Sequence, residues 1–318
     1  MTDLEQHLLA IIQDAFPLEK RPYQVLADQL GSDEQSVFAA VEGLRKSGII
    51  RRIGGVYDSK ALGFISRLCA GKVPTVVTGA ADDNALEKFA AAVNEIPAIT
   101  HNYVRSDEYN VWFTVIAQSE EEIQKIVDDV CAKTELHDVH VLSATKKYKI
   151  NTVMGGVVRR ALQPCKIPAR ILSDSDRTRI HIACDDIPHS QTPFKDWGVS
   201  CEELREDLAL KRMRRFGAIL RHQEAGFAFN AMVCLAELDK SPNNSAGAIL
   251  AQKPFISHCY DRPAFEGFPY TLYAMMHAQS ADELDRNIKE AAESIGNPDY
   301  VVLHSVRELK KTSYRFFA

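Results

Sequence analysis

The stretch IRRIGGV at residues 50–56 returns as MRRFGAI at residues 213–219, and each copy runs on to a Gly-Phe pair, at 63–64 and 226–227. A second motif repeats in the same order, because ITHNYVR at residues 99–105 returns as ISHCYDR at residues 256–262. Further on, AQS at residues 117–119 returns at 278–280. The offsets are 163, 157 and 161 residues, so small insertions and deletions separate the copies. The sequence therefore predicts a tandem duplication of one structural unit.

Length and composition are those of an ordinary folded protein of about two domains. The 318 residues are 46% hydrophobic and 25% charged, which excludes a disordered, collagenous or coiled-coil chain. The net charge of −5 lacks the basic excess of a non-specific nucleic-acid binder. The N-terminus has helical spacing and acidic residues in place of a secretory signal, and no run approaches the roughly 18 apolar residues of a membrane span. With seven scattered cysteines and no CxxC pair, we expect a soluble, cytoplasmic protein with reduced thiols and no membrane partner.

Each copy begins with a pattern typical of a winged helix-turn-helix. In the first copy, residues 22–31 and 33–47 predict two helices, with Ser32 as the N-cap of the second, Gln35 as its capping-box partner and Gly48 at its end. The following residues, GIIRRIGGVYD at 48–58, predict a short two-stranded wing. The equivalent segment of the second copy has 16 residues before its Arg pair where the first has 20, so about one helical turn is missing.

A βαββαβ pattern, typical of a ferredoxin-like α+β unit, follows each winged helix. The first copy predicts strand 64–74, helix 82–94, strands 98–104 and 109–117, helix 119–134 and strand 138–148. The second predicts strand 228–237, helix 241–252, strands 255–260 and 269–278, helix 280–295 and strand 299–309. The predicted domains are a winged helix-turn-helix at 1–60, a ferredoxin-like domain at 61–152, a linker at 153–172, a shortened winged helix-turn-helix at 173–224 and a second ferredoxin-like domain at 225–318.

This domain order resembles the Lrp/AsnC family of transcriptional regulators. Two features argue against DNA reading. Asp33 and Glu34 would place carboxylates where phosphates approach, and the second copy lacks a helical turn. We therefore expect no nucleic-acid partner, while an Lrp/AsnC-type regulator stays open as an alternative function.

A more specific resemblance is to the siroheme decarboxylases, a branch of the Lrp/AsnC-like superfamily. The first half resembles the A-type subunit in IRRIGGVYDSKALGF and ITHNYVRSDEYNVWFT, and the second half resembles the B-type subunit in MRRFGAILRHQEAGFAFNAMV, ISHCYDRPAFEGFPYTLYAMMHAQS and RELKKTSYRFF. The resemblance implies both subunits fused as an internal pseudo-heterodimer, with the tetrapyrrole in or beside the interface. It implies conversion of siroheme to 12,18-didecarboxysiroheme, by loss of two acetate carboxylates as CO₂, in heme or heme d1 biosynthesis. Further self-association of the fused chain is left open.

Siroheme carries carboxylates around a flat, apolar macrocycle, so its site needs cations and apolar or aromatic walls. The repeated motifs supply both. The candidate substrate-binding residues are Arg51, Arg52, Arg105, Tyr103, Tyr109, Trp112, Arg214, Arg215, Arg221, Tyr260, Arg262, Tyr270, Tyr273 and Lys310. The glycines beside the Arg pairs would let the backbone approach a ligand closely. The alternative is that the arginines are solvated and the aromatic residues pack within a sheet.

Histidines are the sharpest catalytic candidates. His101 and His258 occupy equivalent positions, each followed by x-Tyr-x-Arg, and a histidine can deliver a proton at neutral pH. That proton would convert the carbanion-like methylene left by CO₂ loss into a methyl group, and we favour His258 for this role. His222 is a further candidate acid, and His222 or His258 could ligate the siroheme iron.

The sequence has no GxGxxG, P-loop or HExxH motif for a cofactor or metal. We therefore expect no metal or cofactor of the protein's own beyond the iron tetrapyrrole of the substrate, whose macrocycle would accept the electron pair. A non-catalytic heme sensor or carrier would use the same pocket and stays open as a second alternative.

Overall fold

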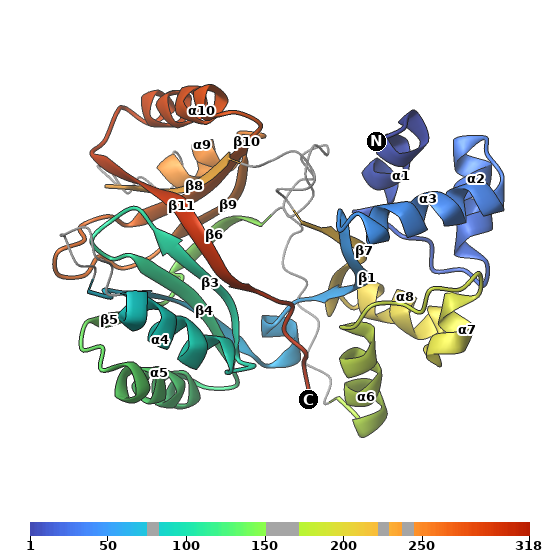
Figure 1. Ribbon diagram of the computed structural model, residues 1–318, viewed down its shortest axis with the longest axis horizontal. Helices are drawn as coiled ribbons and strands as arrows, with labels where there is room; N and C mark the ends of the chain where they lie inside the picture. Colours follow the sequence, from blue (N-terminus) through green and yellow to red (C-terminus); the bar gives the residue numbers. More distant parts are fainter. Residues whose placement is uncertain (75–82, 151–171, 222–228, 237–244) are drawn as a thin grey trace.

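The computed structural model describes residues 1–74, 83–150, 172–221, 229–236 and 245–318. Figure 1 shows two lobes, one built from strands with helices on the outside and one that is mainly helical. Both copies of the repeat contribute to each lobe. His222 and all but the last residue of the predicted linker lie outside the described residues.

The helical lobe contains both winged-helix segments. The first consists of α1 (Asp3–Ile12), α2 (Pro22–Leu30), α3 (Glu34–Lys46) and β1 (Ile50–Tyr57). The second consists of α6 (Asp174–Ala183), α7 (Pro193–Trp197), α8 (Cys201–Ala209) and β7 (Met213–Leu220). Helix α8 has 9 residues where α3 has 13, which confirms the missing turn. The N-cap of α3 is Asp33, whose side chain accepts a hydrogen bond from the Ser36 amide, so the predicted cap is one residue early.

The wing differs from the prediction. β1 and β7 pair antiparallel with each other in a separate two-stranded sheet, with Gly54 opposite Gly217. The predicted two-stranded wing within the first copy is therefore wrong. A Cβ atom at Gly54 would lie 2.2 Å from the carbonyl oxygen of Asp185, and one at Gly217 would lie 2.4 Å from that of Ile12. Each wing strand thus packs against a helix end of the other copy, and only glycine leaves room for that approach.

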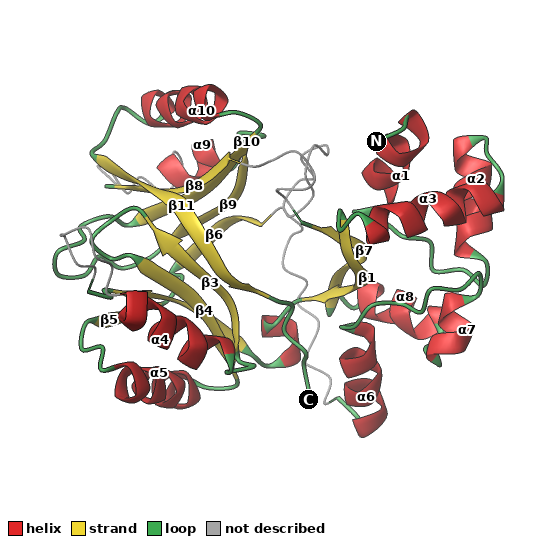
Figure 2. Cartoon of the chain, in the orientation of Figure 1, coloured by secondary structure: helices red, strands yellow, loops and turns green. Residues whose placement is uncertain are grey.

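The second lobe is a nine-stranded antiparallel sheet (Figure 2). The first copy supplies β2 (Ile65–Gly71), α4 (Asp83–Asn94), β3 (Ile99–Arg105), β4 (Val111–Ala117), α5 (Glu120–Thr134), β5 (Val139–Leu142) and β6 (Lys146–Ile150). The second supplies β8 (Phe229–Leu235), α9 (Ala246–Leu250), β9 (Ile256–Asp261), β10 (Leu272–Ala278), α10 (Ala281–Ser294) and β11 (Tyr300–Lys311). A short 3-10 helix, η1 (Lys60–Leu62), precedes β2. The strand order is β5-β2-β4-β3-β11-β8-β10-β9-β6.

Two crossing segments join the copies. β11 pairs with β8 as far as His304 and with β3 from Ser305 onward. Its counterpart in the first copy is divided, because β5 pairs with β2, whereas β6 pairs with β9 of the second copy. The predicted strand 138–148 is therefore two strands, since the chain passes between the copies at residues 143–145. The two edge strands of the sheet are thus consecutive in the chain.

Helices and an inner layer bury the two faces of this sheet. α4 and α5 pack on the strands of the first copy around Phe89 and Phe113, and α9 and α10 pack on those of the second. The inner faces meet in a third cluster that draws Trp112, Phe268 and Tyr273 from both copies. This arrangement confirms the predicted α+β tandem duplication and its internal pseudo-dimer. None of the described helices is long and apolar enough to cross a membrane.

Candidate functional site

The two candidate histidines that the structure describes, His101 and His258, each lie next to a β-bulge. The pairing of β3 with β4 slips by one residue at Thr100, and the pairing of β9 with β10 slips at Ser257. Thr100 Oγ1 lies 2.9 Å from Nδ1 of His101. Ser257 Oγ lies 3.0 Å from Nδ1 of His258. Bulges re-aim side chains next to functional sites, and here a bulge hydroxyl fixes each imidazole through the same ring nitrogen.

Each histidine begins a ladder of three stacked side chains along its strand. The rings of His101 and Tyr103 have centroids 6.5 Å apart and planes 25° apart, and the Arg105 guanidinium lies 5.1 Å from the centroid of the tyrosine ring. The ladder that begins at His258 repeats these values as 6.3 Å, 24° and 5.1 Å. The tyrosine of each ladder is therefore held between an imidazole and a guanidinium, and the predicted His-x-Tyr-x-Arg equivalence is a three-dimensional one.

The arginine of each ladder is tied to a strand crossing. Arg105, which is 6% exposed, donates a hydrogen bond of 3.1 Å to the carbonyl oxygen of Leu303. Arg262 donates one of 2.6 Å to the carbonyl oxygen of Leu142. Leu142 ends β5, and Leu303 lies two residues before Ser305, from which β11 pairs with β3. These contacts favour a structural role for both arginines, and contact with substrate stays a prediction.

Positive charge surrounds His258. Burial lowers its pKa from the ordinary 6.5 to about 4, and the charges of Arg214, Lys147 and Lys149 act in the same direction. Arg214 and Lys147 are exposed, and neither makes an ion pair within the described part of the chain. Asp58 is the carboxylate that acts on Lys147. At neutral pH the imidazole is therefore uncharged, and two cations beside it have no paired anion.

Two of the cations around His101, Arg51 and Lys311, have partners instead. Arg51 donates to the carbonyl oxygen of Lys311 at 3.1 Å and to a serine hydroxyl in the C-terminal segment at 3.0 Å. Lys311 Nζ lies 3.7 Å from the Glu308 carboxylate, which also accepts a 3.4 Å hydrogen bond from Tyr103. Burial lowers the pKa of Arg51, and the positive charge of the exposed Arg221 acts in the same direction. The carboxylate of Glu308 thus lies among the cations of the first-copy site.

Two pairs of equivalent positions carry opposite charges in the two sites. Lys147 faces the ladder tyrosine of the second copy, and Glu308 faces that of the first. Asp58 and Arg221 form the second pair. Their positions are equivalent because their backbone amides make matching hydrogen bonds of 2.8 and 3.0 Å across the wing sheet. The duplication has therefore kept the frame of the two sites and exchanged their charges.

The remaining cationic candidates are bound to backbone. Arg52 donates to the carbonyl oxygen of Gly55 at 3.2 Å, and Arg215 donates to that of Ala218 at 3.1 Å. Both arginines also bond to the helix ends that the wing glycines approach. Lys310 donates two 2.8 Å hydrogen bonds, one to the carbonyl group of the last residue of α4 and one to a carbonyl group two residues beyond it. The close approach that the glycines permit is therefore to a helix of the protein, and these three side chains support the fold.

The aromatic candidates divide in the same way. Tyr109, Trp112, Tyr270 and Tyr273 belong to the cluster between the inner faces of the two copies. Tyr103 and Tyr260 are the ladder tyrosines beside the histidines. Packing is the role that the contacts of the first four favour, and their contact with substrate stays a prediction.

Sequence reasoning missed the hydroxyl residues, and although it named Lys147 among the cations at the ends of the last strands, it did not place that lysine in the second-copy site. A signal for the hydroxyls was present, since Thr100 and Ser257 each precede a repeated histidine. Lys147 lies near the end of a predicted strand of the first copy, and only the crossing of β6 places it beside a histidine of the second.

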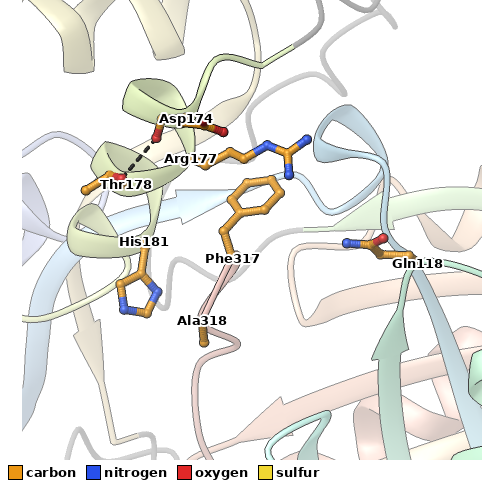
Figure 3. Close-up of a pocket in the computed structure, with 7 residues that line it drawn as sticks. All are labelled: Gln118, Asp174, Arg177, Thr178, His181, Phe317 and Ala318. Atoms are coloured by element: carbon orange, nitrogen blue, oxygen red, sulfur yellow. Dashed lines mark hydrogen bonds between the residues drawn. The ribbon is translucent and has the colours of Figure 1, made fainter.

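A surface pocket lies elsewhere, between α6 and the C-terminal residues. Gln118, Asp174, Arg177, Thr178, His181, Phe317 and Ala318 line it (Figure 3). Its Arg177 guanidinium lies 5.4 Å from the centroid of the Phe317 ring. Because none of the predicted substrate-binding or catalytic residues lines this pocket, the histidine ladders define the candidate site.

The fold and the site together define an Lrp/AsnC-like protein with two fused halves and a cation-lined histidine site. A model of the AsnC-like ligand binding domain matches residues 61–149 and 224–310, and a model of the siroheme decarboxylase NirDL-like HTH domain matches residues 5–51. The siroheme decarboxylase of Hydrogenobacter thermophilus is 32% identical over 98% of this chain and 94% of its own. The chain belongs to the siroheme decarboxylase family.

Two further comparisons agree with this assignment. The siroheme decarboxylase alpha subunit of Desulfovibrio desulfuricans is 45% identical over 47% of this chain and 82% of its own, so half of the fused chain matches a separate subunit. The crystal structure of the siroheme decarboxylase NirDL with an iron-uroporphyrin III analogue superposes with a TM-score of 0.70 at 28% identity, over 99% of this chain and 95% of that one.

Proposed function

We propose that this siroheme decarboxylase removes the acetate carboxylates of siroheme at the second-copy site, with His258 as the proton donor. The activity follows from the family to which the chain belongs. The choice of site depends on one observation, the unpaired cations Arg214 and Lys147 beside His258. A substrate with carboxylates on all sides can pair with these two cations, whereas Arg51 and Lys311 near His101 already have partners in the protein.

The chemistry needs few protein groups. When the bond between the acetate methylene and its carboxylate breaks, CO₂ leaves and the electron pair stays on the methylene carbon, from which the conjugated macrocycle can accept it. A proton on Nε2 of His258 then completes the methyl group. Nδ1 faces Ser257, which leaves Nε2 as the ring nitrogen for the substrate. The cations pair with the non-reacting carboxylates and leave the scissile carboxylate unpaired. A cation that stabilised the scissile carboxylate equally in the ground state and in the transition state would not accelerate its loss.

Substrate binding also prepares the acid. In the free protein, burial and three cations hold the pKa of His258 near 4, so the imidazole is neutral at pH 7. A bound polyanion offsets the charges of Arg214 and Lys147 and raises that pKa, because a nearby negative charge favours the imidazolium form. Substrate binding therefore favours protonation of His258 and is coupled to proton uptake.

We further propose that the reaction uses no metal or cofactor beyond the iron tetrapyrrole of the substrate. The helical lobe has a structural role in this proposal, since α3 begins with Asp33 and Glu34 and α8 is one turn short. Both features disfavour contact with DNA phosphates.

Anaerobic incubation with siroheme, followed by mass analysis of the tetrapyrrole, tests the proposal. His258→Ala should lower the decarboxylation rate by about 10² to 10⁴ with siroheme still bound, because a general acid acts in the transition state. The matched variant His101→Ala should lose much less. Normal turnover by a protein without either histidine would refute the mechanism, and tight binding without CO₂ release by the unmodified protein would indicate a carrier.

A further inference from the structure

A buried hydrogen bond joins the two copies inside the helical lobe. Tyr57, the last residue of β1, belongs to the first copy, and Asp207 on α8 belongs to the second. The Tyr57 hydroxyl donates a 3.0 Å hydrogen bond to the Asp207 carboxylate. Asp207 is fully buried and Tyr57 is 4% exposed, so this contact lies inside the core of the lobe. The wing strand of one copy thus satisfies a buried charge of the other.

Two arginines and a second aspartate surround the Asp207 carboxylate. Arg179 on α6 donates to its two oxygens at 3.1 and 3.3 Å, and Arg212 donates to it at 3.1 Å. Asp176 on α6 lies 2.9 Å from Arg179 and 3.7 Å from Arg212. Each oxygen of Asp207 therefore accepts two hydrogen bonds, and one of the four comes from Tyr57. We call these four charged residues the charged site.

The first copy has aliphatic residues at the equivalent positions. Capping boxes begin both α1 and α6, and the residues that follow the C-caps of α3 and α8, Gly48 and Lys211, both have positive φ angles. These matching helix ends align the two winged-helix segments. The counterparts of Arg179, Asp207, Arg212 and Tyr57 are, in that order, Leu8, Leu44, Ile49 and Leu220. Leu8, Leu44 and Leu220 are buried in the apolar core of the lobe, and we call the first three counterparts the aliphatic site.

Each wing strand therefore fits the helices of the unlike copy. If two first copies paired through their wings, the Tyr57 hydroxyl would meet Leu44, which offers no acceptor. If two second copies paired, Leu220 would meet Asp207 and leave that buried carboxylate one hydrogen bond short. A buried polar group without its partner costs free energy, so both like pairings are disfavoured.

We infer that Tyr57 and the charged site select an unlike copy as the partner of each winged helix. A buried polar contact can specify a partner, because the wrong partner leaves it unsatisfied. The charged site accepts a wing strand that carries a tyrosine hydroxyl, and the aliphatic site accepts one that carries a leucine. This inference concerns assembly of the helical lobe, and it holds whether or not His258 is the proton donor.

A cycle of variants in the full chain separates selection from simple stabilisation. Tyr57→Leu presents the wing residue of the second copy to the charged site. Arg179→Leu, Asp207→Leu and Arg212→Ile together convert the charged site to the residues of the aliphatic site, and Asp176 keeps the hydrogen bonds that it accepts at the start of α6. This triple conversion is made with and without Tyr57→Leu. Urea unfolding, followed by the circular dichroism of the helices, measures the folding equilibrium constant of each protein.

The same change should have opposite effects in the two backgrounds. In the unmodified chain we expect Tyr57→Leu to lower the folding equilibrium constant at least tenfold, which corresponds to about 1.4 kcal/mol. In the converted chain Tyr57→Leu should raise it at least threefold, because an aliphatic site accepts a leucine better than a hydroxyl. A loss or no change in the converted chain would show that Tyr57 only stabilises the lobe, and it would overturn the selection.

A second set of variants changes only one hydroxyl and leaves the charged site in place. Tyr57→Phe removes the hydroxyl from the charged site and should lower the folding equilibrium constant at least threefold. Leu220→Tyr and Leu220→Phe place the same ring against the aliphatic site, where the tyrosine variant should be at least threefold less stable than the phenylalanine variant. Opposite effects of the hydroxyl at the two positions would support selection. An effect of the same sign at both positions, or no effect at either, would overturn it.

Discussion

Exchanging the charges of Lys147 and Glu308 tests whether the two sites differ as their electrostatics indicate. The two residues occupy equivalent positions on the crossing strands, each opposite a ladder tyrosine. Lys147→Glu places a carboxylate beside His258, and Glu308→Lys removes one from beside His101. The double variant has the net charge of the unmodified chain, so it separates the position of the charge from its total.

The magnitude follows from exposure. Lys147 lies at the surface, where a single ion pair contributes about 1 kcal/mol, and reversing the charge adds a repulsion of similar size. Lys147→Glu should therefore weaken siroheme binding by about 2 kcal/mol, or about 30-fold in Kd. Glu308→Lys should leave Kd within about threefold, because beyond the screening length of about 8 Å at physiological salt its charge has little effect on the other site.

Anaerobic absorbance titration of siroheme would measure these constants. The double variant should bind as weakly as Lys147→Glu alone, and higher salt should reduce the difference between that variant and the unmodified protein. Equal weakening by the two single changes, or recovery of full affinity in the double variant, would refute the asymmetry between the sites.

Three further outcomes follow from individual contacts. Arg214→Ala should weaken siroheme binding by about 1 to 2 kcal/mol without lowering Tm. Arg215→Ala should instead lower the free energy of unfolding by about 1 to 3 kcal/mol, because its hydrogen bonds to carbonyl groups are lost. The reverse pattern in siroheme titration and denaturant unfolding would contradict these assignments. Gly217→Ala should lower Tm clearly, at a cost of about 2 kcal/mol or more, because its Cβ would lie 2.4 Å from the Ile12 carbonyl oxygen, and an unchanged melting curve would argue against the packing of β7 on α1. The pKa of His258 is about 4 in the folded protein and ordinarily 6.5, so the unfolded chain binds more protons between these pH values. The free energy of unfolding should therefore fall by up to roughly 3 kcal/mol as the pH falls from 6.5 to 4. His258→Asn should flatten that part of the curve of unfolding free energy against pH.

The sequence was sufficient for the repeat, for the equivalence of His101 with His258 and for the order of helices and strands apart from the division of strand 138–148, because each depends on local pattern. The pairing of β1 with β7 was not predictable in this way. Alternating apolar residues specify which face of a strand is buried, but a hairpin partner and the matching strand of a second copy satisfy that pattern equally well. The glycines at 54 and 217 are explained only once the helix ends of the other copy are in place.

The site was partly predictable for a similar reason. Repetition identifies the ladder residues, but it gives equal weight to arginines with different contacts. Arg214 and Arg215 are adjacent in one motif, yet the first is exposed near His258 and the second is bonded to backbone. Alternation along a strand separates such neighbours, and the sequence alone does not say which of the two faces the substrate.

The presence of two diverged copies of one unit explains how such an asymmetric site can exist. In a homodimer, twofold symmetry repeats every substitution, so a lysine gained beside one histidine is gained beside both. Within one chain, Lys147 and Glu308 can differ, while the ladders and their crossing contacts remain matched. The first copy is still required, because β6 brings Lys147 to the histidine of the second. Divergence has therefore changed the charges around the two histidines, and it has left the shared frame that positions them intact.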